Sequence, residues 1–371
     1  MNRSAAPIGL EVNVTSCSIR YLVGLSTIFL TAFTFVNSRY ATAVEPGQPI
    51  PATFEWVAPE LQPTLIAMQA MMASVPPLSD ESLPQWRSIV FDPRPPLPDI
   101  GAEFRQIPGP AGAPELTVLV INAGAGKSRP GILHTHGGGY VVGSARSGLV
   151  SLQELASTLD CVVVSVDYRL APESPFSGSV EDNYAGLSWM HAHAAELGVD
   201  PSRIAVMGES AGGGHAALLA LTARARGQIP IVLQVLIYPM LDDRTASSRP
   251  VPAHIGKLVW TEEANRYGWT AFLGQPAGGD TVPVAGVPAR AENLAGLPPA
   301  FIGVGAIDLF VDEDINYARR LIDAGVATEL LVVPGAFHAF DVIAPDTELS
   351  RQFTAAKIAA LRRAFGEAAT P

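Results

Sequence analysis

From about residue 115 onward, short runs of β-branched and apolar residues alternate with longer segments of helical pattern. This alternation predicts an α/β fold with a mostly parallel central sheet, because each parallel strand needs a long crossover before the next. Several runs are apolar at nearly every position, as expected of strands that helices cover on both faces. The expected strands are residues 116–121, 131–135, 162–166, 204–207, 231–237, 300–304 and 329–333. The expected helices are residues 149–159, 180–197, 211–226, 312–324 and 347–365.

Two stretches interrupt the alternation. Residues 45–100 hold an apolar helical piece and a proline-rich connection, and residues 241–297 separate two strands by far more than a crossover needs. Long excursions of this kind inside a compact domain are usually functional, for example as a lid. We expect both to form one cap over the carboxyl edge of the sheet, where ligands bind in open α/β folds. The expected division is a cap segment at 44–100, a cap insertion at 241–297, and an α/β domain made of 101–240 and 298–371.

The first forty-odd residues differ in character. Arg3 and Arg20 precede an apolar run at residues 21–36, and small residues follow at Ala41 and Ala43, the two positions that a signal peptidase reads. This layout predicts a signal peptide at residues 1–43 and a periplasmic or secreted protein. Two alternatives stay open. One is a membrane anchor, for which the run is shorter than the roughly 20 residues of a span. The other is an internal start of translation, which would leave the protein in the cytoplasm.

Composition narrows the classes of partner. The chain has 371 residues, 48% of them apolar, and a formal net charge of −11. It is therefore expected to fold, and its acidic balance argues against nucleic acid or an anionic membrane surface, which need clustered Lys and Arg. Without the leader only Cys161 of the two cysteines remains, in an apolar run typical of a buried thiol. Cys and His show no metal-ligand spacing, so no metal and no cofactor are expected.

The segment Gly208-Glu209-Ser210-Ala211-Gly212 matches the pattern G-x-S-x-G. It follows an expected strand and opens a helix rich in Ala and Leu, which is the setting of a nucleophile on a tight strand-to-helix turn. The glycines leave room for the turn, and the helix dipole favours negative charge there. A chance glycine-rich turn is the alternative, but the position at a strand–helix junction favours Ser210 as a nucleophile.

A second glycine-rich segment, His136-Gly137-Gly138-Gly139-Tyr140, follows the strand that ends at residue 135. Consecutive glycines let backbone N–H groups point into a cavity, where two or three such donors stabilise the oxyanion of ester hydrolysis. We expect the amides of Gly137, Gly138 and Ala211 to form this oxyanion hole and His136 to orient the loop. A phosphate-binding loop is the alternative, but no P-loop Lys and no G-x-G-x-x-G pattern support it.

A serine hydroxyl needs a base, and in this kind of fold the chain order is Ser, Asp, His. His338 follows the last expected strand and is the candidate base. Asp308 follows the preceding strand and is the candidate acid, so both should lie at the edge that carries Ser210. We expect His215 to pack in the core. We expect His254 to lie within the cap, either at its surface or in its lining. Three acids in the first turn of the next helix, where acids are common, compete with the candidate acid: Asp312, Glu313 and Asp314.

Together these residues give the chain a resemblance to the hormone-sensitive lipase family of α/β-hydrolases, which includes many bacterial carboxylesterases. The resemblance covers nearly everything from residue 130 to the end of the chain. It is carried by HGGGY from His136, DYRLAPE from Asp167, GESAGG from Gly208, YPM from Tyr238, and residues 308–318.

The resemblance implies Ser210 as nucleophile, Asp308 as acid and His338 as base, in agreement with the chain order, and it places the oxyanion loop at Gly137 and Gly138. It implies small to medium acyl esters as substrates and supporting ion pairs for Arg169 and Glu173. The chain departs from the family at Ala339, where Gly is usual, and it has Glu209 where many members have Asp.

The sequence thus predicts a serine carboxylesterase for short- to medium-chain acyl esters, working through an acyl-enzyme. A lactonase or amide hydrolase with the same triad is the alternative. A non-catalytic small-molecule receptor of this fold would be expected to lack the nucleophile or the base, and a dinucleotide-dependent oxidoreductase would need a glycine fingerprint. The sequence indicates no oligomeric state. Candidate substrate-binding residues are Tyr140, Glu209, Trp260 and Trp269.

Overall fold

The computed structural model describes residue 1 and residues 54–366, except for 90, 91 and 93. Apart from Met1, the predicted leader lies outside the described residues. Among the described helices, none combines the length and the apolar character of a segment that crosses a bilayer.

A single sheet of eight strands runs through the described part of the chain. The strands are β1 (Ala102–Ile107), β2 (Leu116–Ile121), β3 (Arg129–Thr135), β4 (Val162–Val166), β5 (Val199–Glu209), β6 (Leu233–Ile237), β7 (Ala300–Gly305) and β8 (Thr328–Val333). Their order in the sheet is β1-β2-β4-β3-β5-β6-β7-β8. The pairs β1–β2 and β2–β4 are antiparallel, and every pair from β4 to β8 is parallel. The predicted α/β fold with a mostly parallel sheet is confirmed.

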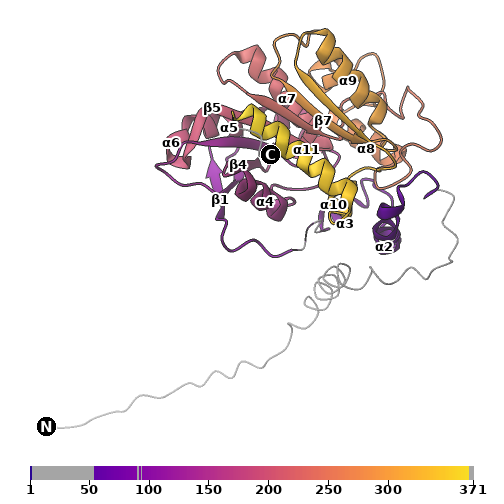
Figure 1. The fold of residues 1–371 in the computed structure, drawn as a ribbon, viewed down its shortest axis with the longest axis horizontal. Coiled ribbons are helices and arrows are strands. Elements are labelled where there is room, and N and C mark those ends of the chain that lie inside the picture. Colours follow the sequence, from indigo (N-terminus) through magenta and orange to yellow (C-terminus); the bar gives the residue numbers. More distant parts are fainter. Residues whose placement is uncertain (2–53, 90–91, 93, 367–371) are drawn as a thin grey trace.

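Helices cover both faces of the sheet, and Figure 1 shows the last of them, in yellow, running across the strands on one side. The covering helices are α4 (Leu149–Leu159), α5 (Phe176–Ala192), α6 (Ala194–Leu197), α7 (Ala211–Arg226), α9 (Val311–Asp323) and α11 (Glu348–Ala364). Two large apolar clusters fill the space between the layers, one beneath α4 and α11 and the other beneath α5, α7 and α9. The strands β4 and β6 are buried at every position, which explains their unbroken apolar sequence.

Three differences from the expected elements have simple causes. Strand β1 was not expected, because it is an edge strand with mostly exposed side chains that pairs only with β2. Strand β5 begins earlier, at Val199, with a register shift opposite Arg129 and Gly131. The helix expected at 180–197 is wrong as one element, because it is interrupted at His193 between α5 and α6.

The two stretches expected to form a cap meet in space. The first holds η3 (Pro59–Leu61), α2 (Gln62–Met72) and α3 (Leu83–Arg87), and the second holds α8 (Glu262–Leu273), η4 (Val284–Gly286) and η5 (Pro288–Arg290). The ring of Trp56 lies 4.8 Å from that of His254, and the hydroxyl of Tyr267 donates to Asp80 Oδ1 at 2.8 Å. These contacts fit one cap, while the domain boundaries stay a prediction.

Candidate active site

Three loops at the carboxyl edge of the sheet carry the predicted reactive residues. Ser210 follows β5, Asp308 follows β7 and His338 follows β8. Because these strands are parallel, their carboxyl ends lie at one edge, and the loops converge there.

Ser210 occupies a strained turn between β5 and α7. Its backbone has φ +56° and ψ −123°, a conformation that residues other than glycine rarely adopt. The backbone is held in place because Ser210 N donates to Ile237 O at 2.9 Å and Ser210 O accepts from Met240 N at 3.0 Å. Close packing also requires the flanking glycines, since a Cβ at Gly212 would lie 2.0 Å from Thr135 O. The turn therefore presents the hydroxyl at the start of α7.

The three predicted residues form one chain of hydrogen bonds. His338 Nε2 lies 2.9 Å from Ser210 Oγ, and His338 Nδ1 lies 2.8 Å from Asp308 Oδ2. The other carboxylate oxygen, Asp308 Oδ1, accepts from Phe310 N at 3.0 Å. Burial increases along the chain, from Ser210 at 8% exposed to Asp308 at 1%. With Nδ1–H donating to the buried carboxylate, Nε2 is free to take a proton from the serine.

Two aromatic rings hold the imidazole of His338 from its sides. The rings of Tyr238 and Phe310 lie 4.9 and 5.2 Å from it, both edge-on. The hydroxyl of Tyr238 donates to Asp341 Oδ1 at 2.9 Å, in the short helix α10 (Phe340–Ile343) that follows the histidine. Sequence reasoning gives these residues no role, although both lie in segments that carry the family resemblance, Tyr238 in the YPM segment and Phe310 in residues 308–318.

The glycine loop lies directly beside Ser210. A Cβ at Gly137 would lie 3.5 Å from Ser210 Cβ and 3.0 Å from Glu209 O. Within the described residues, no backbone hydrogen bond uses the N–H of Gly137 or Gly138, and the N–H of Ala211 begins α7, where helix amides have no partner within the helix. The loop and the helix start thus bring three amides to the region of Ser210, as the sequence predicts for an oxyanion hole.

His136 has the loop-orienting contacts expected from the sequence. Its Nδ1 lies 2.8 Å from Gly137 O, and its ring stacks on Tyr168 at 4.1 Å. Burial lowers the pKa of His136 to about 4, so the ring is neutral at physiological pH. The Tyr168 hydroxyl donates to His136 O at 2.6 Å, which fixes the same segment from its other side.

The four candidate substrate-binding residues differ in position. Trp269 is fully buried against Tyr140, whose hydroxyl donates to Met240 O at 2.8 Å. Glu209 Oε2 lies 2.8 Å from His134 Nε2, and although burial raises the pKa of Glu209, this partner brings it below its ordinary value. Trp260 is half-buried against the glycine loop. Their roles in substrate binding stay predictions.

The acids that compete with Asp308 have other surroundings. The Asp312 side chain is 74% exposed, and Glu313 accepts from the amides of Leu241 and Asp242. Asp314 is fully buried, and its carboxyl oxygens have no hydrogen-bond partner within the described part of the chain. Burial raises the pKa of Asp314 well above the usual range. Within the described residues, His338 makes no hydrogen bond to any of these three acids.

The ion pairs expected around the DYRLAPE segment are present. Arg169 pairs with Asp182 at 2.8 Å, and Glu173 with Arg87 of α3 at 2.7 Å. Burial and the T-shaped contacts of His215 with Tyr140 and two further rings confirm its expected place in the core.

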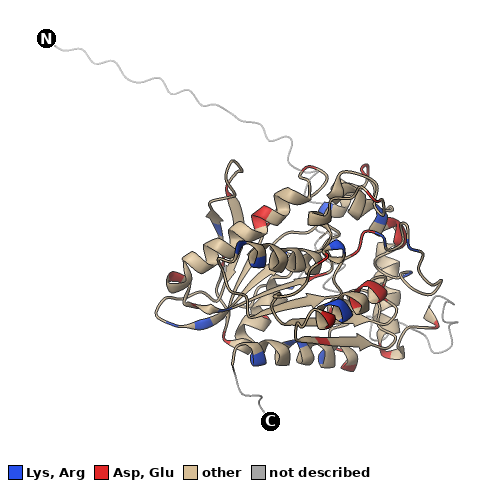
Figure 2. Cartoon of the chain, turned by 90° about the horizontal axis from the view of Figure 1, so that it is seen from above, with Lys and Arg blue, Asp and Glu red and all other residues tan. Residues whose placement is uncertain are grey.

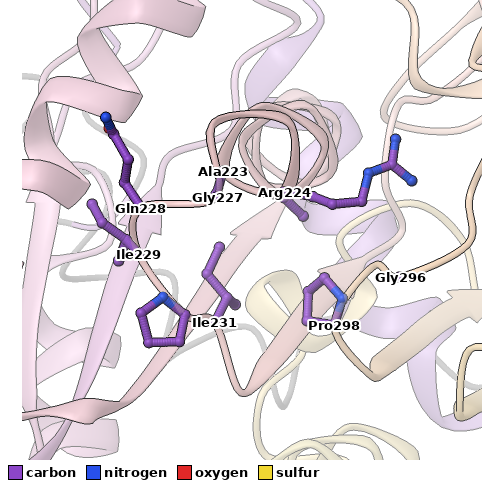
Figure 3. A pocket seen from close by; sticks show the side chains of 10 residues that line it. Ala223, Arg224, Gly227, Gln228, Ile229, Ile231, Gly296 and Pro298 are labelled. Carbon is purple, nitrogen blue, oxygen red and sulfur yellow. The ribbon is translucent and has the colours of Figure 1, made fainter.

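A separate hollow of about 360 Å³ shares no lining residue with these groups (Figure 3). It is lined by the end of α7, the connection to β6 and the segment before β7, so it lies at the amino edge of the sheet. The Arg224 side chain extends from it toward the loop before β7, where Nη1 donates to Asn293 O and Ala295 O. Among the described residues, no cluster of His, Cys, Asp and Glu could hold a metal ion. Lys and Arg positions are interspersed with Asp and Glu positions along the described chain (Figure 2).

Comparison with known proteins gives a consistent picture. A family model described as "alpha/beta hydrolase fold" matches residues 132–342. Esterase LipI of Mycobacterium tuberculosis is 40% identical over 215 residues, which are 57% of this chain and 65% of LipI. Carboxylesterase NlhH of the same species is 37% identical over 247 residues, which are 64% of this chain and 74% of NlhH. The chain therefore spans slightly less than two thirds of LipI and about three quarters of NlhH.

Solved structures agree over more of the chain. A bacterial heroin esterase superposes with a TM-score of 0.72 and 34% identity, covering 84% of this chain and 99% of that structure. The esterase LipW from Mycobacterium marinum superposes with a TM-score of 0.67 and 32% identity, covering 85% of this chain and 98% of that structure.

Proposed function

Because this chain belongs to the α/β-hydrolase family, among the carboxylesterases that are similar to hormone-sensitive lipase, we propose that it is a serine esterase that cleaves short- to medium-chain acyl esters. The observation that carries the proposal is the hydrogen-bonded chain of Ser210, His338 and Asp308, which lies beside a glycine loop. Within the described residues, the amides of Gly137 and Gly138 in that loop make no backbone hydrogen bond. The esterases named among its relatives support the reaction class.

The first half of the proposed reaction forms an acyl-enzyme. His338 Nε2 takes the proton of Ser210 as Oγ attacks the ester carbonyl, and the carbonyl oxygen becomes an oxyanion facing the amides of Gly137, Gly138 and Ala211. Collapse of this intermediate breaks the bond to the alcohol oxygen, which leaves with the proton from His338. Asp308 keeps the imidazole in the right tautomer and stabilises its charged form.

The second half returns the enzyme to its starting state. Water gives a proton to His338 and attacks the acyl group, and a second oxyanion forms in the same place. Its collapse breaks the acyl bond to Ser210 Oγ, which recovers its proton from His338, and the carboxylic acid leaves. These steps are carried by side chains and amides of the chain itself.

The test is hydrolysis of p-nitrophenyl esters, from acetate to palmitate, by the wild type and by Ser210→Ala. We expect turnover of the short esters and a loss of kcat of about 10³-fold or more in the variant, because the nucleophile is removed. A folded wild type that is inert on every ester would contradict the proposal, and lactones and amides would then be the substrates to try.

We also propose that the chain is exported and loses residues 1–43. The support is the charged start, the apolar run at 21–36 and the small residues at Ala41 and Ala43.

A further inference from the structure

The segment of the cap between His254 and α8 contacts both loops that frame the reactive serine. A Cβ at Gly256 would lie 2.4 Å from the Leu309 side chain, in the loop that carries Asp308. Four residues later, the indole of Trp260 covers Gly139 in the glycine loop. The cap is therefore in direct contact with the catalytic machinery at two points.

The contact between Trp260 and Gly139 leaves no room for any side chain. A Cβ at Gly139 would lie 2.1, 2.7 and 3.1 Å from the indole atoms Cη2, Cζ2 and Cζ3. The far edge of the six-membered ring thus rests on the backbone of Gly139. On α8, a Cβ at Gly268 would lie 2.6 Å from Gly139 O, so the helix backbone also approaches the loop closely.

The glycine loop needs such support because its conformation is costly. Gly138, Gly139 and Tyr140 have φ of +124°, +58° and +68°, three positive values in succession. Tyr140 is not a glycine, and strained backbone of this kind persists only where its surroundings hold it. The end of the glycine loop at Tyr140 is held in place because the Tyr140 hydroxyl donates a hydrogen bond to Met240 O and the Tyr140 ring stacks on Phe272 at 3.9 Å. Trp260 holds the middle of the loop.

The indole is itself held in a fixed position. Its Nε1 donates to Asn265 Oδ1 at 3.2 Å, and the buried Asn265 donates from Nδ2 to Thr245 O at 2.9 Å. Directly before it, Val259 has φ +66°, and Trp260 N donates to Leu258 O at 2.8 Å, which closes a γ-turn. A β-branched residue at positive φ in this rare turn is strained, and such strain clusters at ligand clamps and active sites.

From these contacts we propose that Trp260 is a positioning residue for the oxyanion hole, through which the cap fixes the backbone amides that face Ser210. The inference rests on the proposed function. Trp260 acts through Gly139 on the neighbouring Gly137 and Gly138 and touches no reacting atom. Oxyanion donors contribute only when they point at the developing charge, so a small displacement of the loop lowers the rate of the chemical steps.

The experiment is a kinetic comparison of the wild type with Trp260→Ala on p-nitrophenyl esters of several acyl lengths. We expect kcat to fall by about 10- to 100-fold at every acyl length, with KM changed by less than about threefold. The affinity for an alkyl trifluoromethyl ketone, whose adduct places an oxyanion beside the same amides, should fall by the same factor as kcat/KM. A kcat within about twofold of the wild type would overturn the inference, as would a loss confined to KM or to one acyl length.

Two further variants address folding. Trp260→Phe keeps an aromatic ring in the cap, but it lacks the outer edge of the indole that rests on Gly139. Its kcat should therefore also fall, by about tenfold. A wild-type kcat in this variant would contradict the inference. Trp189→Ala is the matched control, because it removes another half-buried indole, which lies in α5 and stacks on His193, and it should leave kcat unchanged. Melting temperatures of all variants report their folding.

A double-mutant cycle tests the contact itself. Gly139→Ala should lower kcat strongly in the wild type, where the methyl group meets the indole, and less in Trp260→Ala, where room has been made. An equal loss in both backgrounds would count against the contact. The wild type and Ser210→Ala are assayed in the same series. Failure of the proposed function would therefore appear as an inactive wild type, and failure of this inference as a fully active Trp260→Ala.

Discussion

At the scale of single residues, the partner of each carboxylate separates Asp308 from its neighbours. Asp308 is buried and bonded to His338, whereas Asp312 is largely exposed and lies 3.7 Å from Arg249. An exposed, screened ion pair contributes little, but a buried carboxylate fixes the tautomer of the imidazole that it contacts. The local partner, and not the charge alone, determines which acid can support the base.

The first residue-scale prediction compares these two acids. Asp308→Asn should lower kcat by about 10⁴-fold, because an amide favours the wrong tautomer of His338. Asp312→Asn is the matched control and should keep kcat within about twofold of the wild type, since its pair is exposed. The measurement is steady-state hydrolysis of p-nitrophenyl acetate. Equal losses in both variants would show that the acid is assigned wrongly.

A second residue-scale prediction concerns acid stability. Burial lowers the pKa of His215 from 6.5 to about 3, and neither ring nitrogen has a hydrogen-bond partner among the residues that the structure describes. Below pH 6.5 the imidazole of His215 is protonated in the unfolded chain, whereas in the folded protein it stays neutral down to about pH 3. His215 therefore makes the free energy of unfolding fall as the pH drops from 6.5 toward 3. The wild type should lose unfolding free energy between about pH 7.5 and pH 5. In His215→Phe, whose ring suits the aromatic surroundings, this loss should be smaller by about 2 kcal/mol. Denaturant unfolding at both pH values measures it, and an unchanged loss would contradict it.

At the scale of elements, α7 combines two requirements in its first turn. It must begin at the strained residue Ser210, and it must pack against the end of β3 closely enough to bring Ser210 beside the glycine loop. The turn Gly212-Gly213-Gly214 meets both, because a Cβ at each position would lie 2.0 to 2.7 Å from a neighbouring atom. Glycine weakens a helix, so close packing outweighs helix propensity here.

The element-scale prediction follows from this packing. Gly212→Ala would place a methyl group 2.0 Å from Thr135 O and 2.7 Å from His136 O, both backbone atoms that cannot move aside easily. We expect a loss of about 3 kcal/mol in unfolding free energy, together with a fall in kcat. Gly101→Ala is the control, since no heavy atom of the described residues, apart from Gly101 and its two chain neighbours, lies within 4 Å of its Cβ position. Thermal and denaturant unfolding of both variants are the measurements, and similar stabilities would argue against the packing.

At the scale of the whole molecule, two stretches that are distant in the chain, and that are predicted to form one cap, contact each other and the α/β domain. The Glu173–Arg87 pair, the Tyr267–Asp80 bond and the Trp56–His254 contact link the segment before the sheet to the rest. That segment is joined to residues outside the described part, and the predicted leader would precede it.

The whole-molecule prediction concerns that leader. If residues 1–43 are a signal peptide, the mature protein should begin at Val44, and a variant that lacks residues 1–43 should keep the full esterase activity. N-terminal sequencing of the protein recovered from the periplasm or medium tests the first point. Recovery of the complete N-terminus in a membrane fraction would favour the membrane anchor, and recovery of a cytoplasmic protein that begins later in the sequence would favour an internal start of translation.

Several features could be predicted from the sequence because they depend on short-range patterns. Alternation of apolar strands and helices predicts the parallel sheet, and a parallel sheet brings every strand's carboxyl end to one edge. It follows that Ser210, Asp308 and His338, each placed after a strand, should meet, and the structure brings them within hydrogen-bond distance. Their catalytic roles stay predictions until the variants are measured.

Other features depend on contacts between residues far apart in the chain, which no local pattern encodes. Strand β1 is set by its pairing with β2, and Tyr238 reaches Asp341 across 103 positions. Ala339, where the family usually has Gly, has φ +60°, a requirement that only the folded backbone reveals. The contact of Trp260 with Gly139 likewise exists only once the cap has folded over the sheet. Hydrophobic periodicity and chain order determine the sheet and the edge that carries the site, whereas close packing between distant segments decides how the site is held.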